Sequence, residues 1–172
     1  MSSLKNVGFT IVELLVVIVI IAILASISIV TYSGIQSRAN NTIVQSDLTN
    51  MAKKIEIDKI TRGEYLPGGT ASSNSTNLPG FKFPVSRDAY WVSSGVNLFY
   101  CQGKIGGNDT FRLVAKSKSG MVYQYDAIGG HSNRGEISIN NTVACQDFAA
   151  GYTWSYGYYA NPSYGWYSWT AN

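Results

Sequence analysis

The feature that most constrains this 172-residue sequence is an apolar run near its N-terminus. From Ile11 to Val30 there are twenty residues, and only Glu13, Ser26 and Ser28 among them are polar. As a helix, a run of this length crosses the roughly 30 Å of a bilayer's hydrocarbon core. The sequence therefore predicts a helix that meets a membrane.

Glu13 restricts the role of this helix. A secretory signal peptide would use Lys5 as its charged region and Ser26-Ile27-Ser28 as its cleavage site. A permanent membrane anchor would use the same apolar run. Neither interpretation supplies a partner for the carboxylate, and an unpaired carboxylate inside such a run is energetically costly.

The stretch "GFTIVELLVVIVIIAILA", residues 8–25, resembles the processing motif of type IV prepilins and the related pseudopilins. In that family a dedicated peptidase cuts after the glycine on the cytoplasmic side and N-methylates the new first residue. The resemblance implies a leader of residues 1–8, cleavage between Gly8 and Phe9, and methylation of Phe9. It also implies three partners: a prepilin peptidase/methyltransferase, pilus assembly machinery in the membrane, and further copies of the chain.

Within this resemblance, Glu13 acquires a partner. Cleavage creates an amine on Phe9 that is mostly protonated at neutral pH. The Glu13 carboxylate of a neighbouring chain can pair with this amine. Apolar helices have little preference for one axial register, so one desolvated charge pair per subunit disfavours every register in which the pair is broken. We therefore predict Phe9 and Glu13 as assembly residues, within a transmembrane and assembly half of residues 9–30.

Many members of the family carry a glycine and a proline inside this apolar segment. The corresponding positions here are Ala22 and Val30. Alanine is the best helix former and valine continues a helix at modest cost. The sequence therefore predicts that this helix is not interrupted.

The helix is expected to continue over residues 31–62 as an amphipathic segment. Its apolar residues recur mostly at spacings of three to five, which indicates one buried helix face. These residues are Ile35, Ala39, Ile43, Leu48, Met51, Ile55 and Ile60. Arg62-Gly63 predicts the end, because Gly63 can adopt a left-handed cap. Residues 63–89 then form a connecting loop, which includes the small-residue stretch 68–80.

Residues 90–172 are expected to form a β-sheet domain. The strand candidates are Tyr90–Val92, Val96–Gln102, Thr110–Lys116, Met121–Asp126 and Glu136–Ile139. The third and fourth flank Lys118-Ser119-Gly120 and predict an antiparallel hairpin. A long helix packed on an antiparallel sheet gives an α+β fold class, in agreement with the type IV pilin fold that the resemblance implies.

The only two cysteines, Cys101 and Cys145, allow one disulfide. We expect this bond if the domain leaves the cytosol, and it would stabilise the fold by about 4 kcal/mol in the chain-entropy account. The alternative is two unpaired buried thiols.

The C-terminal tail, residues 148–172, is rich in aromatic residues and has no charged side chain. The alternation over residues 152–158 and 164–166, with a turn at 160–163, predicts a terminal hairpin with an aromatic face. The candidate surface contacts in this tail are Trp154, Tyr156, Trp166 and Trp169. Such rings can stack on sugars, proteins or bases. We favour packing on the sheet or on the next subunit, because many exposed rings would promote aggregation.

Several kinds of chemistry have no sequence signal. His131, the only histidine, lies in a loop-like stretch without a second ligand at metal-binding spacing. No catalytic constellation or phosphate-binding loop is recognisable, so we expect neither an enzyme nor a cofactor or metal. The net charge of +3 is small, and the tail lacks the cations that usually accompany base stacking, so nucleic acid is not an expected partner.

These observations predict the structural subunit of a type IV pilus. The precursor would lie in the cytoplasmic membrane, and the processed chain would polymerise into an extracellular filament for adhesion, twitching motility or surface attachment. Within the family, the alternatives are a minor or competence pilin and a secretion pseudopilin. From another class, the alternative is a secreted or membrane-anchored glycan-binding domain that uses the aromatic tail.

Overall fold

The computed structural model describes residues 8–68, 78, 80–93, 95–150, 152–160 and 166–170. The chain forms two compact units, Met1–Gln36 and Ser37–Asn172. The boundary between them falls inside the long helix α1, which runs from Ile11 to Arg62. Parts of three expectations lie outside the described residues: leader residues 1–7, residues 69–77 and 79 of the connecting loop, and residues 161–165 of the terminal hairpin.

The first unit consists of the apolar part of α1. Every side chain from Ile11 to Val30 is exposed, and the helix is not interrupted at Ala22 or Val30, as predicted. The hydroxyls of Ser26 and Ser28 donate to backbone carbonyls one turn earlier, at 2.7 and 2.8 Å. These polar groups are satisfied within the helix, which suits an apolar environment.

In the second unit, α1 buries one face. Its buried residues are Val44, Asp47, Leu48, Met51, Ala52 and Ile55. Leu48, Met51 and Ile55 confirm the predicted face, at spacings of three and four. The prediction was wrong for four residues that are exposed, namely Ile35, Ala39, Ile43 and Ile60. A step of five residues turns about 140° around a helix, so the steps from 43 to 48 and from 55 to 60 leave the buried face.

Helix α1 ends as the sequence predicts. Gly63 has a φ of +85°, and its N–H donates to the carbonyl of Lys59 at 2.7 Å. This left-handed residue closes the last turn of the helix.

The sheet has five antiparallel strands in the order β4-β3-β2-β1-β5. The strands are β1 (Gly95–Ile105), β2 (Asn108–Lys116), β3 (Val122–Asp126), β4 (Gly130–Gly135) and β5 (Thr153–Ala160). The short elements are η1 (Arg87–Ala89), α2 (Asn141–Ala144) and η2 (Ser168–Thr170). The predicted hairpin is confirmed as β2 and β3, with Val114 opposite Gln124.

Strand β1 is longer than predicted because it enters a two-residue hairpin turn. Ile105 pairs with Asn108, and Gly106 and Gly107 have φ values of +59° and +86°. A tight turn of this kind needs positive φ at both central residues, which glycine adopts without strain.

Two strand predictions were wrong. The strand after β3 is not Glu136–Ile139 but the polar stretch Gly130–Gly135, because the chain reverses at Gly130 and pairs at once with β3. Ile139 is instead buried without belonging to a strand. Tyr90–Val92 does not form a strand either, since only Tyr90 makes an isolated bridge, to Ser117.

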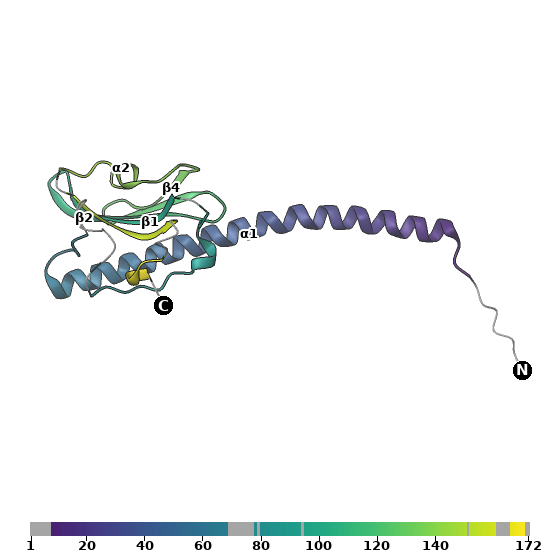
Figure 1. Ribbon diagram of the computed structural model, residues 1–172, viewed down its shortest axis with the longest axis horizontal. Helices are drawn as coiled ribbons and strands as arrows, with labels where there is room; N and C mark the ends of the chain where they lie inside the picture. Colours follow the sequence, from purple (N-terminus) through teal and green to yellow (C-terminus); the bar gives the residue numbers. More distant parts are fainter. Residues whose placement is uncertain are drawn as a thin grey trace, which may run out of the picture. The chain divides into compact units, whose positions relative to one another are not determined.

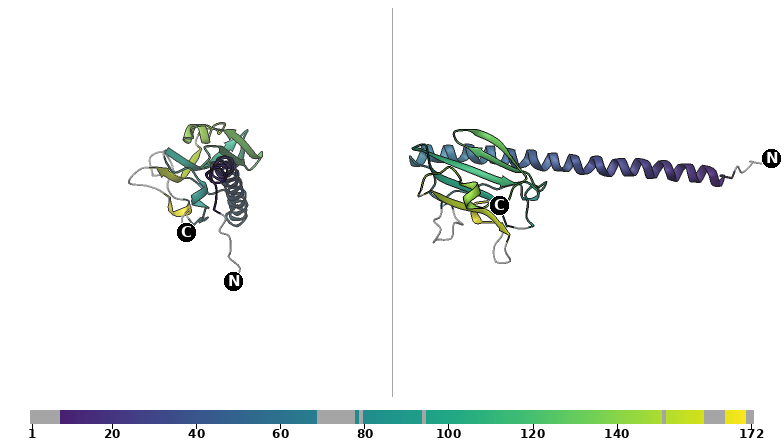
Figure 2. Two further views of the ribbon diagram at one scale, coloured as in Figure 1. Left: turned by 90° about the vertical axis from the view of Figure 1, so that its right-hand side faces the viewer. Right: turned by 90° about the horizontal axis from the view of Figure 1, so that it is seen from above.

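Side chains alternate between the two faces of the sheet and form two apolar clusters. On one face, Leu98, Tyr100 and Leu113 pack with the buried residues of α1. On the other face, Phe99 and Val114 pack near α2. Figure 1 shows α1 along one face of the sheet and α2 over the other, and the views in Figure 2 agree. The second unit is an α+β domain with the long helix packed on an antiparallel sheet.

Candidate assembly site

Helix α1 begins with a reciprocal hydrogen-bond pair between Thr10 and Glu13. The Glu13 backbone N–H donates to the Thr10 hydroxyl at 3.2 Å. In return, the Thr10 backbone N–H and hydroxyl both donate to Oε2 of Glu13, at 2.8 and 2.7 Å. This is a capping box, which satisfies backbone donors that the first helical turn leaves without partners.

The capping box uses only one carboxylate oxygen of Glu13. The second oxygen, Oε1, has no hydrogen-bond partner within the part of the chain that the structure describes. The neighbouring Phe9 side chain is 83% exposed. The start of α1 therefore presents an aromatic side chain and a carboxylate oxygen that can accept a further donor.

The apolar run pointed to Glu13 as a functional residue but not to Thr10. The missed signal is the pattern Thr-x-x-Glu directly before an apolar run, which is the sequence signature of a capping box. The capping box gives Glu13 a partner inside its own chain, in addition to the partner expected from a neighbouring chain.

The apolar part of α1 offers a large unpartnered surface in the described chain. Its large side chains between Ile11 and Val30 are 47–85% exposed. By length and composition α1 can cross a membrane. Such a surface must be covered by lipid or by other apolar helices.

The four aromatic residues proposed as surface contacts differ in burial. Trp169 is 1% exposed and belongs to the core cluster on the α1 face, so its role as a surface contact is corrected. Its indole N–H donates to the Tyr156 carbonyl at 2.7 Å, and its own carbonyl accepts from Phe83 N–H at 2.7 Å. Both bonds hold the C-terminal segment against the domain, where the ring fills the core.

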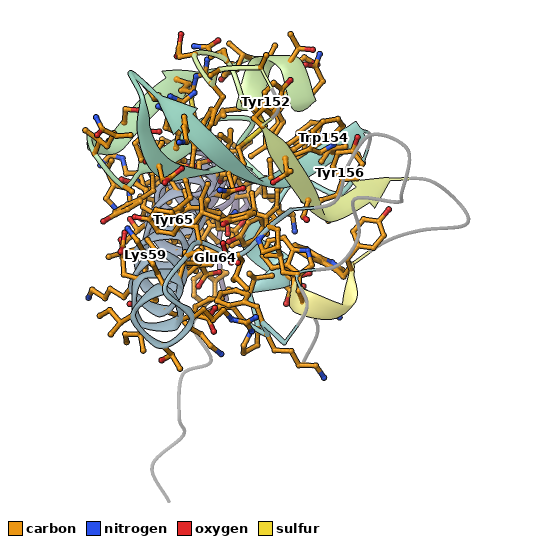
Figure 3. All side chains as sticks on the ribbon, turned by 90° about the vertical axis from the view of Figure 1, so that its left-hand side faces the viewer. Lys59, Glu64, Tyr65, Tyr152, Trp154 and Tyr156 are labelled. Carbon is orange, nitrogen blue, oxygen red and sulfur yellow. A yellow bond between two sulfur atoms is a disulfide. The ribbon has the colours of Figure 1, made fainter. Side chains whose placement is uncertain are left out.

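Tyr152, which directly precedes β5, and Trp154 and Tyr156 on β5 alternate along the chain and share the sheet face that carries the disulfide. All three are half-buried. The rings of Tyr152 and Trp154 have centroids 5.7 Å apart, and Tyr156 meets Phe99 edge to face at 5.1 Å. Figure 3 labels the three residues, which follow one another along this stretch of the chain. They pack on the sheet and still leave part of each ring accessible.

Trp166 is half-buried and is not isolated from cations. The Arg87 guanidinium lies 5.5 Å from the centre of its ring, and Tyr90 meets it edge to face at 5.4 Å. The expectation that nucleic acid is not a partner rested on a tail without cations. In the folded domain, Arg87 places a cation beside Trp166. The lack of cations is therefore true of the tail sequence but not of its surroundings in the fold.

Cys101 and Cys145 form the expected disulfide, with their Cα atoms 5.6 Å apart. The bond joins β1 to the segment that follows α2. His131 lies on β4 rather than in a loop, with Nε2 2.6 Å from the Thr49 hydroxyl oxygen. Within the described residues, no group of His, Cys, Asp and Glu side chains could hold a metal ion.

A processing-type N-terminus, an apolar helix and an α+β domain together define a pilin-like subunit. The family model described as the prokaryotic N-terminal methylation motif matches residues 8–29. The type IV wide pilus major component PilA4 of Thermus thermophilus is 33% identical over 106 residues, which make up 60% of this chain and 78% of that protein. No solved structure gives a significant match.

The identity to this relative and the share of it that is covered show the family. The chain belongs to the type IV pilins, which are structural subunits rather than enzymes.

Proposed function

We propose that this protein is the structural subunit of an extracellular type IV pilus. The precursor sits in the cytoplasmic membrane, where a prepilin peptidase cuts between Gly8 and Phe9 and methylates the Phe9 amine. The match to the N-terminal methylation motif begins at Gly8 and supports this position. Assembly machinery in the membrane then moves the chain into a helical homopolymer.

The observation that carries the proposal is the hydrogen bonding of Glu13. Oε2 caps the helix of its own chain, while Oε1 is open to a second donor. The protonated Phe9 amine of a neighbouring subunit is a matching donor, and a charge-assisted bond in an apolar surrounding is strong. Because the capping box fixes the side chain in advance, little rotamer entropy is lost when the neighbour arrives.

The finer role that we propose is surface attachment and adhesion, with twitching motility as the mechanical use of the same filament. The half-buried rings of Tyr152, Trp154 and Tyr156 support it, since they are anchored on the sheet and remain partly accessible. Rigid aromatic side chains provide contact area at a low cost in conformational entropy.

The test of this function is filament formation by Glu13 variants in the native host. We expect Glu13→Ala to reduce filament yield at least tenfold while the precursor still reaches the membrane, because removing a carboxylate eases insertion but leaves the Phe9 amine without its partner. Yield is measured by immunoblot of sheared filaments and of membrane fractions.

Thr10 variants provide the matched controls. Thr10→Ser keeps the cap and should assemble normally. Thr10→Ala removes the cap but keeps the carboxylate, so its yield should fall less than that of Glu13→Ala. A wild-type yield of filaments from Glu13→Ala would refute the proposed pairing.

A further inference from the structure

Four residues form a transverse row across the sheet on the face away from α1. Trp154 on β5 pairs with Cys101 on β1, Cys101 pairs with Arg112 on β2, and Arg112 pairs with Asp126 on β3. Directly paired residues on neighbouring strands point their side chains to the same face. The guanidinium group of Arg112 therefore shares a surface with the sulfur of Cys101.

Arg112 is the buried cation in this row, with 6% of its side chain exposed. Its Nε lies 2.5 Å from Oδ1 of Asp126, which is enough to compensate the charge. The Nη1 and Nη2 atoms of the guanidinium group contact the segment around Cys145 instead of Asp126. Nη1 donates to the carbonyls of Gln146 at 2.7 Å and Ala144 at 3.4 Å, and Nη2 lies 3.6 Å from Oδ2 of Asp147.

These three contacts surround Cys145. They involve Ala144, Gln146 and Asp147. Arg112, which is paired with Cys101, therefore holds the chain on both sides of Cys145. Asp147 has a φ of +72°, a left-handed conformation that is uncommon for a residue other than glycine. A contact that holds Asp147 there offsets part of its backbone strain.

A second arginine binds the same segment. Nη1 of Arg134 on β4 donates to the Val143 carbonyl at 2.9 Å. Burial, and then the charge of Arg112, lowers the pKa of Arg134 below its ordinary value. Placing two cations near each other is unfavourable, and here their donors converge on the carbonyls of one short segment, residues 143–146.

We propose that Arg112 is a positioning residue for the oxidation of Cys101 and Cys145. It docks residues 144–147 on the sheet before the disulfide exists, so that the two thiols already face each other when an oxidant arrives. The disulfide then locks an arrangement that ionic hydrogen bonds have built. A charge-assisted contact of this kind, in a buried place, is strong enough to order a short segment.

The oxidant belongs to the class of oxidised dithiols. One cysteine thiolate attacks the oxidant's disulfide and forms a mixed disulfide, and the second cysteine thiolate displaces the oxidant's remaining sulfur. The oxidant's S–S bond breaks, the Cys101–Cys145 bond forms, and two electrons and the two thiol protons pass to the oxidant.

The test measures the effective concentration of the two thiols in the full-length chain in detergent micelles. Reduced protein is equilibrated with mixtures of reduced and oxidised glutathione, free thiols are alkylated, and the oxidised fraction is read by mass spectrometry. We expect Arg112→Gln to lower the effective concentration at least tenfold. The effective concentration in Arg112→Lys should lie between the values for wild type and Arg112→Gln, because one ammonium group cannot reach Asp126 and both carbonyls together.

The matched control is Leu113→Ala. Leu113 is the next residue on β2, is fully buried and faces α1, so it weakens the fold without touching the cysteine segment. Its effective concentration should stay within about twofold of wild type while near-ultraviolet circular dichroism shows a folded reduced chain. An Arg112→Gln value equal to wild type, or lowered no more than that of Leu113→Ala, would overturn the proposal.

A second readout needs no redox chemistry. The Ala149 N–H donates to the Lys104 carbonyl at 2.8 Å. In a chain that carries both Cys101→Ser and Cys145→Ser, we expect this N–H to stay protected from hydrogen exchange. Adding Arg112→Gln should remove that protection. If Arg112→Gln does not fold, Arg112→Lys decides both readouts, and wild-type values in that variant would equally reject the positioning role.

Discussion

Asp47 is the buried acid that joins α1 to the segment leading into the sheet. Its Oδ2 accepts the Ser86 backbone N–H at 2.8 Å and the Tyr90 hydroxyl at 3.1 Å. Burial, and then the charge of Asp47, raises the pKa of the Tyr90 hydroxyl well above its ordinary value. The phenol therefore remains protonated and keeps donating to the carboxylate.

Replacing Asp47 by alanine should lower the free energy of unfolding by about 3 kcal/mol, because the buried Tyr90 hydroxyl and the Ser86 N–H lose their charged acceptor. The measurement is urea unfolding of the oxidised full-length chain in micelles. Asp109→Ala is the control, since Asp109 is 63% exposed and its ion pair with Lys104 spans 3.9 Å; its effect should stay below about 0.5 kcal/mol. Equal effects of the two variants would show that the Asp47 contacts do not hold the helix.

Buried polar residues are the part of this protein that sequence patterns predict worst. Asp47 and Arg112 look like surface residues in a hydrophobicity pattern, and their partners lie 39 and 14 residues away along the chain. Glu13 is different because its misfit is visible in the apolar run itself. The residue it bonds within its own chain, Thr10, lies three positions away and could have been found from the capping-box pattern.

Among the helices and strands, those whose bounds depend on local sequence were predicted correctly. The end of α1 at Gly63 and the β2–β3 hairpin follow from a capping glycine and a turn between alternating strands. Strand β4 was missed because its residues are polar and glycine-rich, and only pairing with β3 makes them a strand. Tertiary pairing there outweighs β propensity.

The C-terminal segment 166–170 covers the edge strand β5 and closes the core. Tyr167 N–H donates to the Gly157 carbonyl at 3.0 Å, and the Trp169 ring lies 6.3 Å from that of Phe81. Trp169→Ala should lower the free energy of unfolding by about 3–5 kcal/mol and expose dye-binding apolar surface, because it leaves a large cavity. Melting followed by circular dichroism, together with dye fluorescence, measures both effects.

Trp91 provides the comparison for that prediction. It is half-buried, with the Lys116 ammonium 4.9 Å from its ring centre. Trp91→Ala should cost less than half as much as Trp169→Ala, since less area is buried. A melting temperature unchanged by Trp169→Ala would mean that the tail does not stabilise the domain and would favour a purely adhesive role.

For the whole molecule, the sequence predicted the plan better than the details. A membrane-length apolar run, a continuing amphipathic helix and a later set of strands are enough to expect a long helix packed on an antiparallel sheet. The sequence could not predict that Trp169 returns to the α1 face or that Arg112 holds the segment around Cys145. Those contacts depend on which strands become neighbours in the sheet, and the spacing of apolar residues along the sequence does not predict this.

The most direct test of the proposed processing and assembly is the intact mass of the protein isolated from the native host, both from sheared filaments and from membranes, measured before and after reduction. We predict a filament subunit that begins at Phe9, carries one methyl group on its amine and gains two hydrogens on reduction. A chain that begins near Ile29 would identify a signal peptide, and a chain that still begins at Met1 would identify a plain membrane anchor. Either of these results would contradict the proposed processing and assembly.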